Sequence, residues 1–250
     1  MPGILEIRDL QKKFDSNHVI RGFSLDVVEG TLSCLVGPNG AGKTTLMDLI
    51  SGRLKPTSGS VKFDDLELIG MSESQIAKRG VGRKFQVPAV FKNLTVQENL
   101  EVAYSRVTNP IRNMFRFQDA AMKQRMDEVC SLVGLDERLY TEAGLLSHGE
   151  TQWLEIGMVL MQDPKLLLLD EPIAGMTEVE AEKTAGLLRE IRKRATLIVV
   201  EHDMGFVRKI ADVVTVMHMG SLLAQGRIDE IEADPMVREV YLGTTEEEVA

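Results

Sequence analysis

Hydrophobic and polar residues alternate in two stretches near the N-terminus, residues 4–7 and 23–27. Alternation with a period of two is typical of strands with one buried face, so these stretches predict an antiparallel ribbon. A continuous apolar stretch, Leu32–Val36, follows and predicts a short buried strand. A glycine-rich turn comes next, and helical spacing then runs through Leu46, Leu49 and Ile50. The pattern therefore predicts a strand, a glycine loop and a helix in that order.

The middle of the chain, from about residue 88 to residue 161, has helical spacing, as in Met122, Met126, Val129 and Val133. Apolar runs return at residues 166–169 and at Thr196–Val200, with a charged helical segment, residues 178–194, between them. Buried strands that alternate with helices are typical of a parallel sheet with crossover connections. Residues 213–225 predict a closing hairpin. The pattern thus predicts an α/β fold with an inserted helical region.

Composition and charge narrow the class of protein. The chain has 250 residues, of which 44% are hydrophobic and 27% charged, as in ordinary globular proteins. The formal net charge of −9 argues against binding of nucleic acid through a basic surface. No apolar run approaches the ~20 residues of a membrane span, and the N-terminus lacks the features of a secretion signal. With two cysteines that lie far apart, we expect a reducing cytoplasm.

The glycine-rich turn matches the pattern G-x-x-x-x-G-K-[ST] in the context that supports a phosphate loop, between a strand and a helix. Glycines let consecutive backbone N–H groups face one anion, and the start of a helix adds partial positive charge. We expect Lys43 to reach the outer phosphates of a nucleotide and Thr44 to hold magnesium. The predicted phosphate loop comprises Gly37, Pro38, Asn39, Gly40, Ala41, Gly42, Lys43 and Thr44.

Two acids, Asp170 and Glu171, directly follow four consecutive leucines. An apolar run of this kind fits a strand buried on both faces, and open α/β sheets bind ligands at the carboxyl ends of such strands. We expect Asp170 to hold magnesium and Glu171 to orient and deprotonate an attacking water. The alternative is a strand that ends in two solvated acids. The phosphate loop favours the hydrolytic interpretation.

Residues 146–150 read LSHGE, and here the chain resembles the ATP-binding subunits of ABC transporters, whose signature is usually written LSGGQ. The resemblance covers nearly the whole chain. It implies that Phe14 stacks on adenine, that Gln86 contacts magnesium, and that His202 is the switch histidine. It implies a catalytic set of Lys43, Gln86, Glu171 and His202, and a magnesium set of Thr44, Gln86 and Asp170. Beyond the phosphate loop, it adds to the ATP-binding set Thr45, Ser147, His148, Gly149 and Glu150.

The same resemblance implies an α/β P-loop NTPase core of the RecA-like type, with an antiparallel β subdomain and an inserted α-helical subdomain. We expect one ABC ATPase domain over residues 1–243, with the core at about 1–86 and 162–243 and the helical subdomain at about 87–161. Residues 244–250 form an acidic tail. The resembled proteins work as head-to-tail dimers, in which the phosphate loop of one protomer and the signature of the other enclose each ATP.

The signature departs from the family pattern at two positions: His148 replaces a glycine and Glu150 replaces a glutamine. A carboxylate at residue 150 would lie near the γ-phosphate of the opposing site, which is repulsive. However, residues 147–150 also fit a capping box, with Ser147 as N-cap and Glu150 turned back to the Ser147 N–H. A third departure is Thr177, where many family members have an aspartate, and it puts communication between the two ATP sites in doubt.

Several sequence details look like the importers of hydrophobic amino acids and amides, among them GRKFQ at residues 82–86 and EPIAGMT at residues 171–177. Within that group the chain most resembles the urea-type subunit, UrtD, and second the branched-chain amino acid type. The resemblance implies transmembrane permease subunits, a second ATPase subunit in a homo- or heterodimer, and, indirectly, an extracytoplasmic solute-binding protein. It places the chain peripherally on the cytoplasmic face of the membrane, with ATP and magnesium as cofactors.

Two other classes are compatible with parts of the sequence. One is a soluble ABC ATPase that serves an assembly machine, such as iron–sulfur cluster scaffolding, since those chains have a similar length. The other is a P-loop kinase, which is disfavoured because the signature and the switch histidine would then have no purpose. Co-purification with hydrophobic membrane subunits or with soluble scaffold proteins distinguishes the transporter from the assembly machine.

Overall fold

The computed structural model describes residues 3–84, 90–104 and 120–240. Within these ranges a six-stranded sheet has the strand order β10-β9-β3-β8-β7-β6. β6, β7, β8, β3 and β9 are parallel neighbours, and β9 and β10 form an antiparallel hairpin. The strands are β3 (Leu32–Val36), β6 (Val81–Arg83), β7 (Leu166–Asp170), β8 (Thr196–Val200), β9 (Val213–His218) and β10 (Ser221–Gly226). The predicted parallel sheet and closing hairpin are confirmed.

The central strands are buried along their whole length, because helices or the second sheet cover both faces. Every residue of β3, β7 and β8 is buried, as their continuous apolar sequences predict. In their register, Asp170 of β7 is the partner of Val200 in β8, and Val200 is also the partner of Leu35 in β3. The loops that follow these three strands therefore leave the sheet at one edge.

A second, four-stranded antiparallel sheet has the order β2-β1-β4-β5. Its strands are β1 (Gly3–Phe14), β2 (Asn17–Val28), β4 (Ser58–Phe63) and β5 (Leu66–Glu67). The predicted ribbon is confirmed as β1 and β2, but both strands are longer than the alternating stretches. β4 and β5 complete the antiparallel part. This sheet shares a core with α1 (Lys43–Ile50), built around Phe23, Phe63, Leu46 and Met47.

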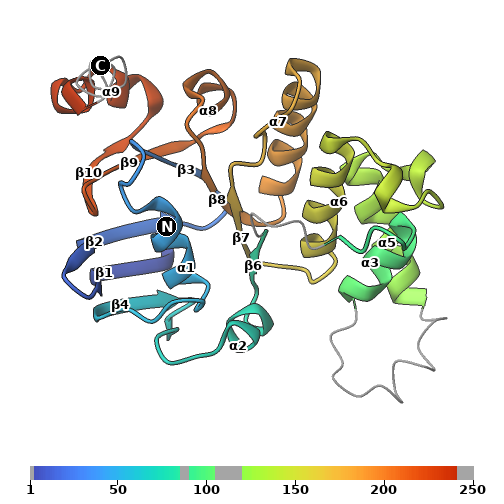
Figure 1. Cartoon of the computed structure of the whole chain (residues 1–250), viewed down its shortest axis with the longest axis horizontal. Helices are drawn as coiled ribbons and strands as arrows, with labels where there is room; N and C mark the ends of the chain where they lie inside the picture. The colour runs from blue at the N-terminus through green and yellow to red at the C-terminus, as the bar shows by residue number, and fades with distance from the viewer. Residues whose placement is uncertain (1–2, 85–89, 105–119, 241–250) are drawn as a thin grey trace.

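The helices between β6 and β7 lie together at one side of the molecule, away from the four-stranded sheet (Figure 1). They are α3 (Val96–Tyr104), α5 (Ala120–Val133) and α6 (His148–Leu160), with 3-10 turns at Asp136–Arg138 and Ala143–Leu145. The predicted helical insertion is present in the described part of the chain, although its boundaries with the core stay a prediction. The other helices are α2 (Glu73–Lys78), α7 (Glu178–Arg192), α8 (Met204–Ile210) and α9 (Ile228–Ala233).

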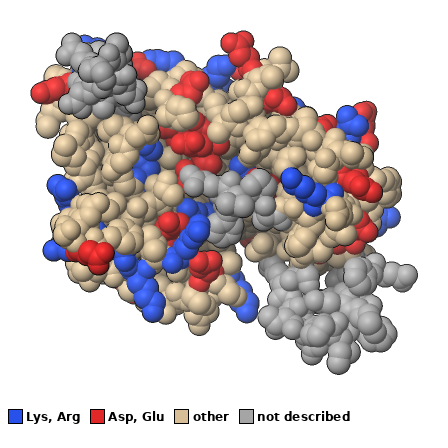
Figure 2. All heavy atoms as spheres, viewed as in Figure 1, with Lys and Arg blue, Asp and Glu red and all other residues tan. Residues whose placement is uncertain are grey.

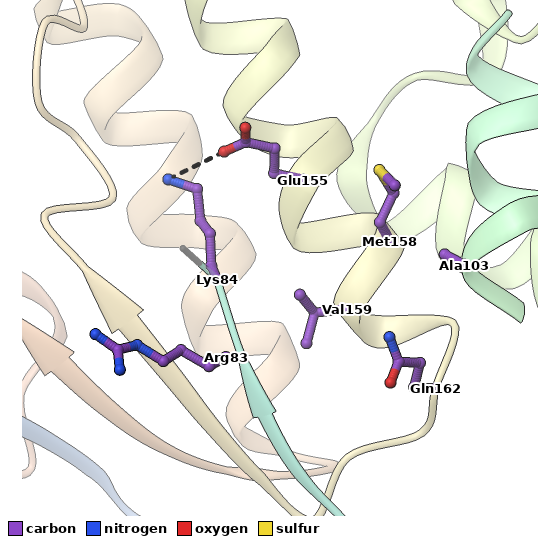
Figure 3. A pocket seen from close by; sticks show the side chains of 7 residues that line it. All are labelled: Arg83, Lys84, Ala103, Glu155, Met158, Val159 and Gln162. Carbon is purple, nitrogen blue, oxygen red and sulfur yellow. Dashed lines mark ion pairs between the residues drawn. The ribbon is translucent and has the colours of Figure 1, made fainter. Parts of the chain in front are cut away.

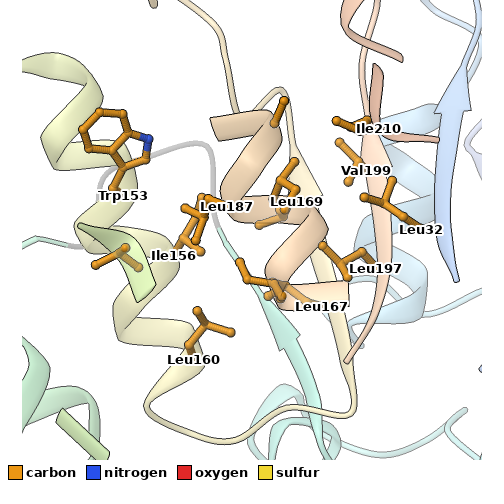
Figure 4. Packing of buried hydrophobic residues seen from close by; sticks show 14 of the residues in the cluster. Leu32, Trp153, Ile156, Leu160, Leu167, Leu169, Leu187, Leu197, Val199 and Ile210 are labelled. Atoms are coloured by element: carbon orange, nitrogen blue, oxygen red, sulfur yellow. The ribbon is translucent and has the colours of Figure 1, made fainter. Parts of the chain in front are cut away.

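One hydrophobic cluster joins the helical side to the larger sheet, and it includes side chains from α6, α7, β7, β8 and β3 (Figure 4). Trp153 lies in this cluster at 5% exposure, and its indole Nε1 donates to Thr184 Oγ1 on α7 at 2.9 Å. The cluster includes Trp153, Ile156 and Leu160 from α6, and Leu32, Leu167, Leu169, Leu197 and Val199 from the sheet. α6 is thereby held against the rest of the fold.

A search of the described helices finds none that combines the length and the apolar character of a membrane span. On the face shown in Figure 2, Lys and Arg side chains are scattered and do not join into a continuous basic surface.

Candidate active site

The phosphate loop follows β3 and is shaped by glycines that no other residue can replace. Gly37 has φ 152° and Gly42 has φ 102°. A Cβ atom on Gly37 would lie 2.1 Å from the carbonyl oxygen of Met217, so the loop touches the backbone of β9. The carbonyl of Ala41 accepts from the N–H of Gly220 at 3.0 Å. The hairpin β9–β10 therefore supports the loop from one side.

α1 begins directly after the loop. Its N-cap residue is Gly42, so no N-cap side chain accepts a hydrogen bond from the first N–H groups of the helix. The first N–H groups of a helix lack partners inside the helix, and an anion such as phosphate satisfies them. Thr44 and Thr45 occupy this first turn, where Thr44 is exposed and Thr45 is half-buried. The first turn of α1 thus has the chemistry of a phosphate site.

The side chain of Lys43 folds back over the loop. Its Nζ donates to the carbonyl oxygens of Gly37 at 2.6 Å and Pro38 at 3.1 Å. Burial lowers the pKa of Lys43, while the charges of Glu171 and Asp170 act in the opposite direction. A phosphate beside Nζ would also favour the charged form. The side-chain nitrogen of Lys43 is therefore held in the loop, close enough to Glu171 and Asp170 to feel their charges.

Asp170 ends β7 and is only 4% exposed. Within the described part of the chain, neither of its carboxylate oxygens has a hydrogen-bond partner. Burial raises the pKa of Asp170, Glu171 and Asp48 raise it further, and the charges of Arg83 and Lys43 oppose this. A buried carboxylate without a partner is costly, and a divalent cation would satisfy it. The site therefore fits magnesium on an observation independent of the sequence motif.

Glu171 and His202 face each other across the ends of β7 and β8. Glu171 Oε1 lies 3.8 Å from His202 Nδ1, and both side chains are accessible to water, at 43% and 69% exposure. Glu171 adopts φ 46°, and its N–H donates to the carbonyl oxygen of Val200 at 2.9 Å. A non-glycine residue in the left-handed region is strained, and such strain is concentrated at functional sites. Both groups are open to solvent, so one water beside them can contact the carboxylate and the imidazole.

Glu201 is a site residue that the sequence reasoning missed. It is 1% exposed, and its carboxylate accepts from the N–H of Ile173 at 3.4 Å and from the N–H of His202 at 3.3 Å. Burial raises the pKa of Glu201 to about 7. Its carboxylate therefore links the loop after Glu171 to the loop that carries His202. The available signal was a glutamate placed directly after the buried strand Thr196–Val200.

The turn at the start of α6, residues 147–150, is called the signature turn below, and it contains the predicted capping box. Ser147 is the N-cap of α6, its Oγ accepts from the N–H of Glu150 at 3.1 Å, and its own N–H donates to Glu150 Oε2 at 2.9 Å. The other carboxylate oxygen of Glu150 accepts from Arg138 Nε at 3.1 Å. The negative charge of Glu150 is therefore held by its own helix start and by one arginine.

The two remaining departures, His148 and Thr177, lie close to each other in the same chain. His148 Nε2 lies 2.9 Å from the carbonyl oxygen of Ala174, which only accepts, so this nitrogen carries the proton. A Cβ atom on Gly175 would lie 3.2 Å from His148 Nε2. Thr177 is the N-cap of α7 and forms a capping box with Glu180. The histidine thus joins the signature turn to the loop between Glu171 and α7.

The structure brings four predicted residues to one edge of the sheet, namely Lys43, Asp170, Glu171 and His202. Within the described ranges, no hydrogen bond or ion pair joins the phosphate loop to residues 147–150. Phe14 ends β1, is 41% exposed and has Lys12 Nζ 4.7 Å above its ring. Gln86 and the acidic tail lie outside the described residues.

A phosphate loop after a central strand, with an acid pair at the end of the neighbouring strand, defines a P-loop nucleotide hydrolase. Comparison with known proteins gives the family: the family model described as ABC transporter matches residues 20–174. The chain belongs to the ABC transporter family. It is similar to a crystal structure of an ABC transporter ATP-binding cassette in an ADP conformation, with 30% identity over 97% of this chain and 100% of that chain and a TM-score of 0.87. It is also similar to a crystal structure of a nucleotide-free ATP-binding cassette from an ABC transporter, with 30% identity over 96% of this chain and 98% of that chain and a TM-score of 0.85.

Two curated relatives extend over almost the entire chain. The high-affinity branched-chain amino acid transport ATP-binding protein BraF of Pseudomonas aeruginosa is 35% identical, over 96% of this chain and 98% of its own length. The probable branched-chain amino acid transport ATP-binding protein LivG of Archaeoglobus fulgidus is 32% identical, over 98% of each. The chain is an ABC ATPase that binds and hydrolyses ATP, which excludes the P-loop kinase. These relatives do not support the expected urea type and agree with the alternative expectation.

Proposed function

We propose that this chain is the ATP-hydrolysing subunit of an importer of branched-chain amino acids or of solutes close to them. The observation that carries the site assignment is the buried, unpartnered carboxylate of Asp170 beside Lys43 and the solvent-open pair of Glu171 and His202. Lys43 can contact a phosphate, Asp170 can bind a cation, and Glu171 and His202 can contact a water. Hydrolysis of the terminal phosphate of ATP needs the phosphate, the cation and the water side by side.

In this proposal the loop N–H groups and Lys43 bind the outer phosphates. Magnesium, held by Thr44, Asp170 and Gln86, would neutralise charge on the phosphates when bound. Glu171 orients the attacking water and accepts its proton. His202 approaches the same water from β8, and Phe14 stacks on adenine. Glu201 holds the loop after Glu171 and the loop of His202 together, because its carboxylate accepts a backbone N–H from each.

Residues 147–150 act on the nucleotide of a second ATPase subunit. Ser147, His148 and Glu150 lie at the exposed start of α6, where remaining N–H groups are available for a phosphate of that subunit. The working unit is a homo- or heterodimer on transmembrane permease subunits. The chain is then peripheral on the cytoplasmic face of the membrane, and an extracytoplasmic binding protein delivers the solute.

Two solute classes are supported by different observations. The two curated relatives, both branched-chain amino acid transport ATP-binding proteins, favour branched-chain amino acids. The second class, urea or a short amide, rests only on the resemblance of the sequence to the urea-type subunit, and the curated relatives do not support it. The ATPase does not touch the solute, so its site chemistry leaves both classes open. Co-purification with membrane subunits separates either from a soluble assembly machine.

Reconstitution tests the function. The chain is placed in vesicles with its permease subunits, its second ATPase and a binding protein, and ATP hydrolysis is measured with leucine or with urea. We expect stimulation by one of the two, and none in the matched vesicles that contain the Glu171→Gln variant. Stimulation by leucine alone supports the branched-chain type, and stimulation by urea alone supports the amide type. Hydrolysis that neither solute changes would refute both.

A further inference from the structure

A buried lysine, Lys84, connects the larger sheet to the helix that carries the signature turn. Lys84 directly follows β6, and its backbone N–H donates to the carbonyl oxygen of Leu168 on β7 at 3.0 Å. The backbone of Lys84 therefore continues the sheet. Its side chain leaves the sheet toward α6 and ends beside Glu155 (Figure 3). One residue thus joins the end of β6 to the middle of α6.

The ammonium group of Lys84 contacts two side chains of α6. Its Nζ lies 3.4 Å from Glu155 Oε2, and it also donates to Gln152 Oε1. Gln152 and Glu155 are three positions apart, so they lie on one face of the helix. The side chains of Lys84 and Glu155 are only 4% and 5% exposed. Water screens the ion pair weakly at such a site, so removing one partner leaves the other charge buried without compensation.

α6 also approaches β6 at Gly82. A Cβ atom on Gly82 would lie 2.6 Å from Val159 Cγ1, so only glycine allows this distance. Beside the approach lies the pocket of Figure 3, whose lining includes Lys84, Glu155 and Met158. The side chains of the described residues leave this space open. The contact of Lys84 with α6 therefore supplies a connection that close packing does not supply there.

The approach of Gly82 to Val159 and the contact of Lys84 restrain α6 at different distances from the signature turn. Val159 lies eleven residues after His148, so the helix between the Gly82 approach and the signature turn is about 16 Å long. A tilt of about 5° around that approach moves the signature turn by about 1.4 Å. The contact of Lys84 lies nearer the signature turn than Val159, and it opposes such a tilt. Without it, the contacts of Trp153 with Thr184 and of His148 with Ala174 still hold the start of α6, but neither contact leads to β6.

The ammonium group of Lys84 also feels the charges of acidic residues at the ends of β7 and β8. Burial lowers the pKa of Lys84, and the carboxylates of Glu155, Asp170 and Glu201 act in the opposite direction. Asp170 ends β7 and Glu201 follows β8. The largest of these charge effects comes from Glu155, the residue of α6 that Lys84 contacts.

We propose that Lys84 is a positioning residue for ATP hydrolysis. Through Gln152 and Glu155 it sets the angle at which α6 presents residues 147–150 to the nucleotide of the second subunit. The inference rests on the proposed use of the signature turn against a second site. It assigns Lys84 no contact with substrate, and it predicts an effect on turnover separate from nucleotide binding.

The test compares Lys84→Met with the double variant Lys84→Met/Glu155→Met, and uses Lys193→Met, an exposed lysine paired with Glu190, as the matched control. In Lys84→Met we expect a lower melting temperature, because the positive charge that faces buried Glu155 is lost. We expect kcat to fall about 10- to 100-fold, because a displacement near 1 Å is enough for this. The Kd for ATP should stay within about twofold, because the phosphate loop is unchanged.

The double variant separates positioning from folding. Replacing both partners of a buried ion pair by apolar residues restores stability in other proteins, so we expect the melting temperature to recover while kcat stays low. Lys84→Arg should recover most of kcat, because a guanidinium can contact both Gln152 and Glu155. Native Trp153 emission checks that α6 remains packed on α7.

Three outcomes would overturn the inference. The first is a kcat of Lys84→Met within about twofold of the wild type. The second is a double variant that regains kcat together with its melting temperature, since the pair would then be structural only. The third is wild-type hydrolysis that is independent of protein concentration and of a second ATPase subunit. That last result would refute the proposed second site itself, whereas the first two leave it intact.

Discussion

Glu150 departs from the family signature, and its contribution to the free energy of unfolding can be estimated from its contacts. Its Oε2 accepts from the N–H of Ser147 and its Oε1 from Arg138 Nε, with side-chain exposures of 20% for Glu150 and 54% for Arg138. Glu150→Ala removes both contacts and the acid in the first turn of α6. Glu150→Gln keeps an oxygen that can accept from Ser147, but loses the charge. The two variants therefore separate the cap from the charge.

The expected magnitudes follow from these contacts. The reciprocal cap contributes about 1 kcal/mol. A half-exposed ion pair such as that with Arg138 contributes at most about 1 kcal/mol, and an acid at a helix start about 0.3–1 kcal/mol. We therefore expect Glu150→Ala to lower the free energy of unfolding by about 1.5–2 kcal/mol, and Glu150→Gln by about 0.5–1 kcal/mol. For a chain of this size, 1 kcal/mol corresponds to about 2–4 °C in melting temperature.

Chemical denaturation followed by fluorescence is the assay, because Trp153 is the single tryptophan of the chain and lies three residues after Glu150. The Kd for ATP and the rate of hydrolysis are measured on the same variants. If Glu150→Ala unfolds within about 0.3 kcal/mol of the wild type, the cap does not stabilise the protein. If Glu150→Gln instead tightens ATP binding about tenfold, the carboxylate repels the nucleotide and the capping account is wrong.

Four further predictions concern the hydrolytic edge and its loops. Glu171→Gln should lower kcat by about 10²–10⁴-fold while ATP still binds; near-normal turnover would remove Glu171 from the base role. Lys43→Ala should weaken ATP binding itself, measured by titration with a fluorescent ATP analogue, and unchanged affinity would contradict the proposed phosphate contact. The pKa of Glu201 rises from 4.5 to about 7 on folding, so its contribution to stability is present at low pH and is lost as pH rises from about 4.5 through 7. Glu201→Gln should therefore flatten the stability profile over that range, and an unchanged profile would show that Glu201 does not titrate there. His148→Ala should lower kcat more than His148→Gln, whose amide can still donate to Ala174; equal rates would show that this contact is not used.

The phosphate loop and the signature cap could be predicted because each depends on neighbours in the sequence. A buried strand, glycines and a lysine within twelve residues specify the loop, and Ser147 and Glu150 specify the cap over a single helical turn. Asp170 and Glu171 were found for a similar reason, since the four leucines before them indicate a strand buried on both faces. In each case the physical cause lies within one element.

Contacts between elements were decided only by the tertiary structure. The carboxylate of Glu201 and the ammonium of Lys84 look like ordinary solvated charges in the sequence, yet both are buried, because other segments cover them. Glu201 is held by backbone N–H groups of its own loop and of the loop after β7, and Lys84 by α6, about seventy residues away in the chain. Whether a charge is solvated or buried depends on what packs opposite it, and no local pattern records that.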